Sequence, residues 1–287
     1  MRESVIVAEG FDVLSRRMVC LATVGLLFAG LLGQIQAADQ PAGNQSTPRR
    51  LRVLSYNIHH ADGVDGKLDL ERIAGVIRGC EADVVAVQEV DRGVERSQKI
   101  DEPRELAKLT KLEHFVFGKT IDHQGGDYGN LVLSRFPVAS SKTHLFSNTA
   151  AAEQRGAVEA EIAPPGGPSF RLFATHLDFG RKETSEADRQ AAIRLVNERV
   201  AANDQPAIFA GDFNCVPESR TVSTIRESWL QSNSADAFTT PVSRPARQID
   251  FIFLRPKERW KVIDVKVLDE AIASDHRAIL ATVELLP

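Results

Sequence analysis

The sequence of 287 residues predicts one mixed α/β (α+β) domain. Short runs rich in Val, Ile and Phe, bounded by Gly, Pro or polar residues, recur from residue 51 onward and are typical of strands. Amphipathic stretches typical of helices alternate with them. Neither an internal repeat nor a change of composition indicates a second domain, and about 250 residues suffice for one full core.

Residues 1–37 have the pattern of a secretory signal peptide. Arg16 and Arg17 precede an apolar stretch at residues 18–32, and small residues follow at Ala37. The stretch is shorter than the roughly 20 residues that a membrane helix needs. We therefore expect cleavage near Ala37, a secreted or periplasmic location, and no stable membrane insertion afterwards. The alternative is a membrane anchor formed by the uncleaved segment.

Residues 38–50, rich in Gln, Pro, Gly and Ser, predict a flexible linker, and the domain covers residues 51–287. The formal net charge is −4, and no basic patch marks a nucleic-acid surface. Nucleic acid is not excluded as a partner, because a metal ion can recruit a phosphate locally. We expect a monomer that acts on a phosphoester substrate.

Two cysteines remain after removal of the leader, Cys80 and Cys215. Cys80 precedes a strand that delivers Glu89, whereas Cys215 follows a strand that delivers Asp212. If both strands point toward one site, the sulfurs lie on the order of 20 Å apart, at about 3.3 Å per strand residue. A disulfide requires Cα atoms within about 7 Å, so the sequence predicts two free thiols.

The first half of the domain begins with a strand, a helix and a second strand. Asp69 is expected to cap the helix, since apolar residues at helical spacing follow it. The expected elements are a strand at residues 51–56, a helix from residue 70, a strand at 84–87, a helix at 102–112 and a strand at 130–134.

The second half begins with a hairpin, whose turn contains Pro164, Pro165, Gly166 and Gly167. The longest helix is expected to begin at Ser185 as N-cap, with Asp188 completing a capping box. The expected elements are strands at 156–162 and 170–174, a helix at 185–200, and strands at 207–210, 249–254, 260–267 and 278–285.

Four polar clusters carry the functional signal, and the first three directly follow strand-like apolar runs. A carboxylate in such a setting is costly unless it is paired or binds a cation. The clusters are Gln88-Glu89, Thr175-His176, Gly211-Asp212-Phe213-Asn214 and Ser274-Asp275-His276.

Oxygen donors dominate these clusters, and no Cys/His set has zinc spacing. Such donors suit Mg²⁺ or Mn²⁺, which position a phosphate and activate water. No Ser or Cys has the context of a nucleophile, so direct attack by water is the simpler mechanism. Asp212 and His276 are both candidates for the base, and Asp250 could orient the imidazole of His276.

The ordered set of motifs resembles the endonuclease/exonuclease/phosphatase superfamily over residues 51–286. Each motif alone is weak, whereas the set in this order is specific. The motifs are Leu54-Ser55-Tyr56-Asn57-Ile58, Val87-Gln88-Glu89-Val90, Gly129-Asn130 with Leu133-Ser134-Arg135, Thr175-His176-Leu177, Gly211-Asp212-Phe213-Asn214, Ile249-Asp250-Phe251 and Ser274-Asp275-His276.

The resemblance implies a deoxyribonuclease-I-like fold, a four-layer sandwich of two packed, mostly antiparallel mixed β-sheets flanked by helices. It also implies Mg²⁺ or Mn²⁺ as cofactor. Glu89 would be the main metal ligand, Asn57 a secondary polar contact beside it, and Asp275 a support for the metal or for His276.

The resemblance assigns catalytic roles to the other clusters. Asp212 and Asn214 would orient water and phosphate, while Asp250 and His276 would form a dyad. His176 would face the phosphate or the leaving group. Members differ over whether the aspartate or the histidine accepts the proton, and we favour His276 with Asp250.

Two further residues are expected to contact substrate, Arg155 and Asn130, although Arg155 could instead form a surface ion pair. Residues 92–104, 123–127 and 147–154 are expected to form the rim of the cleft.

The sequence thus predicts an exported Mg²⁺- or Mn²⁺-dependent phosphoester hydrolase, a nuclease-like or lipid or nucleotide phosphodiesterase. The alternatives are a phosphomonoesterase of the inositol-phosphatase type and a catalytically silent binding module of the same fold. A silent module would normally lack Glu89, Asp212 or His276, and all three are present.

Overall fold

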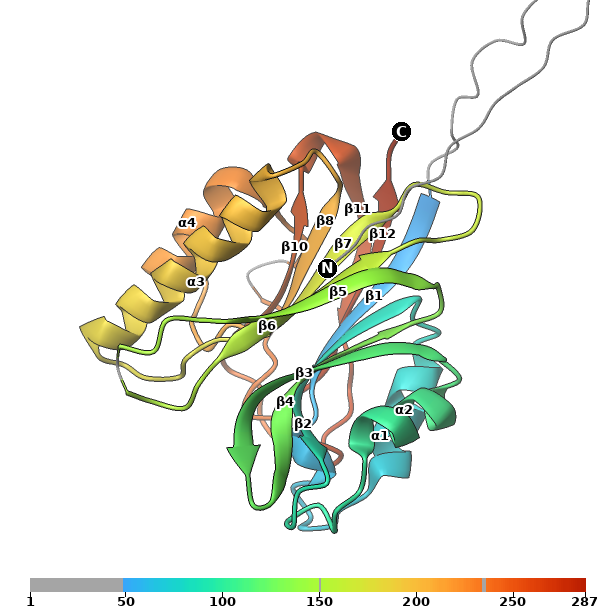
Figure 1. The fold of residues 1–287 in the computed structure, drawn as a ribbon, viewed down its shortest axis with the longest axis vertical. Helices are drawn as coiled ribbons and strands as arrows, with labels where there is room; N and C mark the ends of the chain where they lie inside the picture. The colour runs from blue at the N-terminus through green and yellow to red at the C-terminus, as the bar shows by residue number, and fades with distance from the viewer. Residues whose placement is uncertain (1–48, 150, 234–235) are drawn as a thin grey trace, which may run out of the picture. The chain divides into compact units, whose positions relative to one another are not determined.

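The computed structural model describes residues 49–149, 151–233 and 236–287. The expected signal peptide and residues 38–48 of the expected linker lie outside this part. Two six-stranded sheets pack face to face, and helices cover their outer faces (Figure 1). The predicted four-layer sandwich is therefore confirmed.

The first sheet contains one parallel pair, β1 with β2, and its other described pairs are antiparallel. In spatial order its strands are β11 (Trp260–Val267), β12 (Ile279–Leu285), β1 (Arg49–Asn57), β2 (Val84–Arg92), β4 (Gly126–Ser134) and β3 (His114–His123).

The second sheet likewise contains one parallel pair, β7 with β8, and its other described pairs are antiparallel. In spatial order its strands are β5 (Val138–Leu145), β6 (Gly156–Ile162), β7 (Phe170–His176), β8 (Ala207–Asp212), β10 (Asp250–Arg255) and β9 (Leu230–Gln231). The expected hairpin is β6–β7, with Gly156 opposite His176.

Four α-helices and two short 3₁₀ helices complete the described elements. Asp69 caps the first α-helix as predicted, by accepting a hydrogen bond from the backbone N–H of Arg72. The helices are α1 (Leu70–Gly79), α2 (Glu102–Thr110), α3 (Glu183–Ala201), α4 (Arg220–Ser228), and the 3₁₀ helices η1 (His59–Ala61) and η2 (Lys257–Arg259).

Three apolar layers hold the sandwich together. Alternate residues along each strand face opposite sides, so one face of each sheet packs on the other sheet and one on helices. Val53 and Ala86 pack between the sheets with Leu172 and Ile208. The outer layer under α3 and α4 is rich in aromatic side chains: Phe173, Phe209, Phe213, Trp229, Phe251 and Phe253.

The start of the long helix differs from the prediction. α3 begins at Glu183, and Lys182 occupies the N-cap position without a side-chain hydrogen bond. Ser185 therefore lies in the first turn, buried. Asp188 accepts a hydrogen bond from Thr149 instead of completing a capping box. The predicted capping box at Ser185 was wrong.

Both cysteines are free and buried, which confirms the expected absence of a disulfide between them. Within the described residues, no helix has both the length and the apolar character needed to cross a bilayer.

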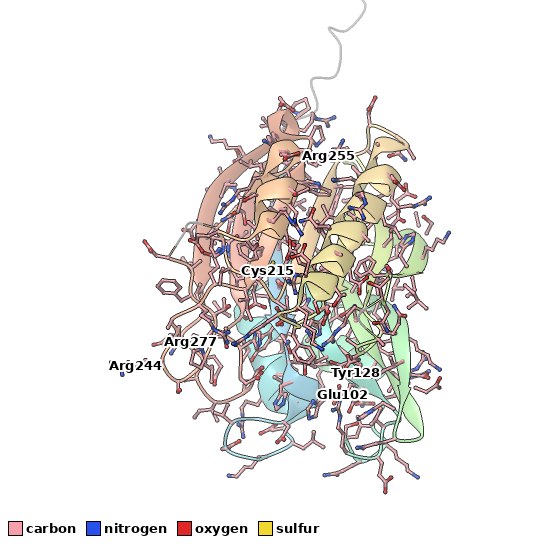
Figure 2. All side chains as sticks on the ribbon, turned by 90° about the vertical axis from the view of Figure 1, so that its left-hand side faces the viewer. Glu102, Tyr128, Cys215, Arg244, Arg255 and Arg277 are labelled. Carbon is pink, nitrogen blue, oxygen red and sulfur yellow. The ribbon has the colours of Figure 1, made fainter. Side chains whose placement is uncertain are left out.

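The topology brings the predicted site residues to one end of the two sheets. The parallel strands β1, β2, β7 and β8 end there, and the antiparallel strand β10 begins there. In Figure 2, Tyr128 on β4 and Arg255 at the end of β10 lie toward opposite ends of the domain, and Arg255 marks the end away from the site.

Candidate active site

Asn57 at the end of β1 joins the two sheets at the site. Its amide nitrogen donates to Glu89 Oε1 (2.9 Å) and to Asp212 Oδ2 (3.2 Å). Its amide oxygen accepts from the backbone N–H of His59 (3.1 Å). In this arrangement Asn57 orients two carboxylates and does not present a free oxygen.

Glu89 sits on a β-bulge. The register between β2 and β4 shifts between Val87 and Val90, and Glu89 has a left-handed φ of 60°. This conformation is costly for a residue with a side chain, and a bulge re-aims its side chain. The side-chain amide of the preceding residue, Gln88, is buried and has no hydrogen-bond partner within the described residues. The local backbone is thus arranged to present Glu89 at the strand end.

Asp212 is fixed by the turn that follows β8. Its Oδ1 accepts from the backbone N–H of Asn214 (2.8 Å), and Asn214 itself has a left-handed φ of 51°. Gly211 is required before it, because a Cβ there would lie 1.9 Å from the carbonyl oxygen of Thr175. Burial raises the pKa of Asp212 to about 7, against the opposing charge of His276 and with the help of Asp250.

His276 and Asp250 form the predicted dyad. His276 Nδ1 lies 2.9 Å from Asp250 Oδ2, and since a carboxylate only accepts, Nδ1–H donates. The hydroxyl of Thr239 donates to the same oxygen. The opposite nitrogen, His276 Nε2, lies 3.7 Å from Asp212 Oδ2. Burial alone would lower the pKa of His276, but Asp250 and Asp212 outweigh it and raise the pKa to about 10.

His176 at the end of β7 is a neutral imidazole. Burial lowers its pKa well below the ordinary value, and the charges of Arg155 and His276 lower it further. Arg155 Nη1 donates to Nδ1 (3.0 Å), so the ring hydrogen lies on Nε2. Nε2 is 3.5 Å from Asp212 Oδ2. The amide nitrogen of Asn214 lies 2.9 Å from Nε2 and, as a donor itself, does not bond to Nε2–H in this tautomer.

Arg155 does not form a surface ion pair, which was the alternative role that the sequence allowed. Its side chain is 9% exposed and pairs with Glu153 Oε1 at 2.7 Å while it donates to His176. Burial raises the pKa of Glu153, and the nearby charge of Glu89 adds to this.

These groups surround a cavity of about 350 Å³. Most of the predicted site residues line it. They are Glu89, Arg155, His176, Asp212, Asn214, Asp275 and His276.

Three predicted residues lie behind the cavity wall. Asn57 and Asp250 contact wall residues as described above. Asn130, which was expected to contact substrate, is buried and donates to the carbonyl of Gly156 (3.0 Å). Its amide therefore braces β4 against β6 instead of facing the cavity.

The rim comes from the three expected segments, through Arg96, His123 and Glu153. Arg96 is held by two hydrogen bonds of 2.9 Å to the buried carboxylate of Asp91, and its guanidinium lies 5.3 Å from the centre of the Tyr128 ring. Sequence reasoning identified these segments but not these side chains, because nothing in the local pattern distinguishes them from solvated charges.

Phe179 and Thr239 were missed altogether. Phe179 lines the cavity three residues after His176, and Thr239 lies in the loop before β10. Only the closeness of Phe179 to the His176 motif could have indicated it.

The donor set suits a hard divalent cation. Within the described part of the chain, Glu89 and Asp275 line the cavity without an ion pair to Lys or Arg. Asp212, Asp250 and His276 also lie with potential ligand atoms within 4.8 Å of one another, but His276 Nδ1–H already donates to Asp250. Cavity-lining carboxylates without a basic partner are the oxygen ligands that Mg²⁺ and Mn²⁺ prefer.

Two known proteins with similar sequences illustrate the relatives of this chain. The chain is 26% identical over 258 residues to the uncharacterized protein YbhP of Escherichia coli K12, covering 84% of this chain and 99% of YbhP. It is 27% identical over 192 residues to a 5′-tyrosyl-DNA phosphodiesterase of Caenorhabditis elegans, covering 63% of this chain and 48% of that protein.

A similar solved structure is the endonuclease/exonuclease/phosphatase from Beutenbergia cavernae. Its TM-score is 0.69 at 27% identity, covering 83% of this chain and 72% of that one. The sequence profile of the Endonuclease/Exonuclease/phosphatase family matches residues 54–276, which span every cluster of the site. The chain therefore belongs to the Endonuclease/Exonuclease/phosphatase family.

Proposed function

We propose that this protein is a Mg²⁺- or Mn²⁺-dependent phosphoester hydrolase that acts on phosphodiesters by direct attack of water. One observation carries the proposal: acidic groups, a cationic imidazole and a neutral imidazole donor converge on one cavity at the ends of the strands. This combination supplies a cation site, proton acceptors and phosphate donors together.

Glu89 and Asp275 are the proposed metal ligands, with Asn57 holding the Glu89 carboxylate in place. A bound divalent ion would neutralise phosphate charge and lower the pKa of water. The chain's own contribution is the fixed orientation of the carboxylates. Ser274 supports it, because its hydroxyl donates to the carbonyl of Asn57 (2.7 Å) and so ties the Asp275 loop to β1.

Asp212 and His276 are the two groups placed to handle the proton of the attacking water. Asp212 Oδ2 and His276 Nε2 lie 3.7 Å apart, so the charge of each group shifts the pKa of the other and the two titrate as a coupled pair. With Asp250 and Thr239 behind it, His276 keeps Nε2 toward the cavity. We assign proton transfer to this pair as a unit.

Arg155 and His176 form the proposed clamp for the phosphoryl oxygens or the leaving group. Nε2–H of neutral His176 is a donor next to the cavity, and Arg155 fixes that tautomer through Nδ1. Asn214 adds an amide at the same place, and it donates to the carbonyl of Leu177 (3.0 Å), which limits its rotation. Donors held in place before substrate arrives stabilise charge that develops in the transition state.

The family contains both phosphodiester and phosphomonoester chemistry, as its name and the tyrosyl-DNA phosphodiesterase indicate. We propose a phosphodiester substrate, with that relative as support. A phosphomonoesterase of the inositol-phosphatase type is the second candidate. The signal-peptide pattern of residues 1–37 leads us to propose that the protein is exported, which fractionation of the producing cells tests. We also propose a monomer, which light scattering tests.

Hydrolysis of bis-p-nitrophenyl phosphate by the purified chain tests the proposal. Activity should require Mg²⁺ or Mn²⁺, and Glu89→Ala, Asp212→Ala and His276→Ala should each lose about 10³-fold or more. Glu105→Ala, at a half-buried position on α2 that does not line the cavity, is the matched control. Full activity in any of the three site variants contradicts the assignment, and metal binding without turnover of any phosphoester supports the silent module.

A further inference from the structure

A second cavity adjoins the catalytic one. It has a volume of about 510 Å³ and shares two lining residues, Phe179 and Asn214, with the catalytic cavity. Phe179 is 63% exposed and carries the guanidinium of Arg155 at 5.9 Å from its ring centre. The two cavities thus meet at Asn214 and at Phe179, whose ring lies beside the clamp residue Arg155.

The second cavity is lined by three arginines, Arg181, Arg189 and Arg247, and no acidic side chain lines it. Arg189 is already committed to Glu186 and to backbone carbonyls. The side chains of Arg181 and Arg247 are exposed, and neither makes a hydrogen bond or ion pair within the described residues. We call this site, defined by Arg181, Arg247 and Phe179, the arginine cavity.

Some other arginines have acidic partners, whereas Arg194 and Arg244 are exposed and make no side-chain hydrogen bond or ion pair within the described residues. Arg220 pairs with Glu183 at 2.7 Å, and Arg277 pairs with Asp269 at 2.8 Å. Arg181 and Arg247 differ from Arg194 and Arg244 because they line one cavity, and no acidic side chain lines that cavity. Their uncompensated positive charge favours an anion next to the catalytic site.

The segments that carry the two arginines are fixed. Arg189 Nη1 donates to the carbonyls of Asp178 (2.8 Å) and Gly180 (2.9 Å), which holds the turn before Arg181. Gly180 packs so closely on α3 that a Cβ would lie 2.1 Å from Ser185 Oγ. The backbone of Arg247 is paired in both directions with Thr240. Because the backbone that carries both arginines is already held, binding a ligand orders only their side chains.

We propose that the arginine cavity binds a second phosphate of the substrate, one that is separated from the scissile phosphate by a moiety lying over Phe179. This inference rests on the proposed function and narrows its substrate class to phosphodiesters that carry an additional phosphate. Arg181 and Arg247 are its specificity-determining residues, and neither touches the reacting atoms.

Two matched pairs of compounds test the proposal. Thymidine 5′-(p-nitrophenyl phosphate) is compared with its 3′-phosphorylated form, and propyl p-nitrophenyl phosphate with its 3-phosphopropyl form. Each pair differs by one phosphate, and only the first contains a nucleoside. The measured quantity is the ratio of kcat/KM within a pair. A preference for the phosphorylated member in both pairs indicates phosphate recognition, and a preference confined to the first indicates recognition of a nucleotide.

Wild type should prefer the phosphorylated member, and Arg181→Ala or Arg247→Ala should lower that ratio about tenfold each, the loss of one charged contact. Arg244→Ala is the control, because Arg244 lies on the loop of Arg247 but projects away from the ribbon (Figure 2) and does not line the cavity. The preference should also weaken with added salt. Equal ratios in wild type and both variants overturn the proposal.

Binding measurements test this inference independently of the proposed function. The same four compounds are titrated calorimetrically into the chain without added metal. A Kd for the phosphorylated members that rises about tenfold in Arg181→Ala and Arg247→Ala supports the arginine cavity even where no compound is turned over. Equal Kd values within both pairs in wild type overturn it, whatever the hydrolytic result.

Discussion

Glu102, the first residue of α2, should make the stability of this protein fall as pH rises. Its side chain is 1% exposed; one oxygen accepts from the backbone N–H of Asp91 (2.8 Å), and the other has no partner within the described residues. Burial raises its pKa from 4.5 to about 8, against the Asp91 hydrogen bond and with the help of the Asp91 charge. The folded state therefore keeps a proton that the unfolded state releases.

The direction and size of this change in stability follow from proton linkage. Between pH 4.5 and about 8 the folded chain binds more protons at Glu102 than the unfolded chain, so stability declines by up to about 1.4 kcal/mol per pH unit. From pH 5 to 7 the loss is about 2.5 kcal/mol, a large share of the ~5–15 kcal/mol typical of a domain. Glu102→Gln resembles the protonated acid at every pH and removes this dependence.

Urea unfolding of wild type and Glu102→Gln at pH 5, 6, 7 and 8 measures the effect. The two free energies should be similar at pH 5 and diverge steadily, with the variant more stable at pH 8. Glu105→Gln, on the same helix and with a side chain 38% exposed, should follow wild type at each pH. Parallel curves for wild type and Glu102→Gln would refute the reasoning, since all other titrating groups are common to both.

Four further predictions concern the site and the core. Chelation by EDTA should abolish phosphodiester hydrolysis, and Mg²⁺ or Mn²⁺ should restore it; full activity in chelator contradicts a metal-dependent reaction. Thr239→Val removes a hydrogen bond to Asp250 and should lower kcat about tenfold with a displaced pH–rate profile, whereas a change in KM alone would exclude a positioning role. Phe209→Ala, in the aromatic layer under α3, should cost about 3–5 kcal/mol of unfolding free energy in urea titration. Cys80 and Cys215 should react with a thiol reagent only after denaturation, and rapid labelling of the native chain would contradict their burial.

The central strands could be predicted from the sequence because both of their faces are buried. Runs such as Val84 to Val87 and Ala207 to Ala210 are apolar throughout, and the polar residue that ends each run is conspicuous. The edge strands β3 and β5 lack that signal. β5 contains the exposed residues Ser140, Ser141 and Lys142, which blunt a sheet edge and also hide the strand from pattern reading.

The site could be predicted in outline but not in its contacts. Motifs identify Asp212 and Asp250, but only the antiparallel register of β8 and β10 places these residues directly opposite each other. The contact of Arg155 with His176 likewise depends on the register of β6 and β7. Thr239 could not be found at all, since a single threonine in an aperiodic loop carries no signal before the chain is folded.

The bulge at Glu89 lowers the stability of the fold but presents a residue that the proposed reaction requires. A left-handed residue with a side chain costs on the order of 1–2 kcal/mol, and the unpartnered amide of Gln88 adds a similar penalty. Glu89→Gly would relax the backbone and remove the proposed metal ligand in the same step. Directed evolution of this protein for heat resistance alone should therefore drift toward inactive variants at this strand end, whereas selection that also requires turnover must find its stability elsewhere in the sandwich.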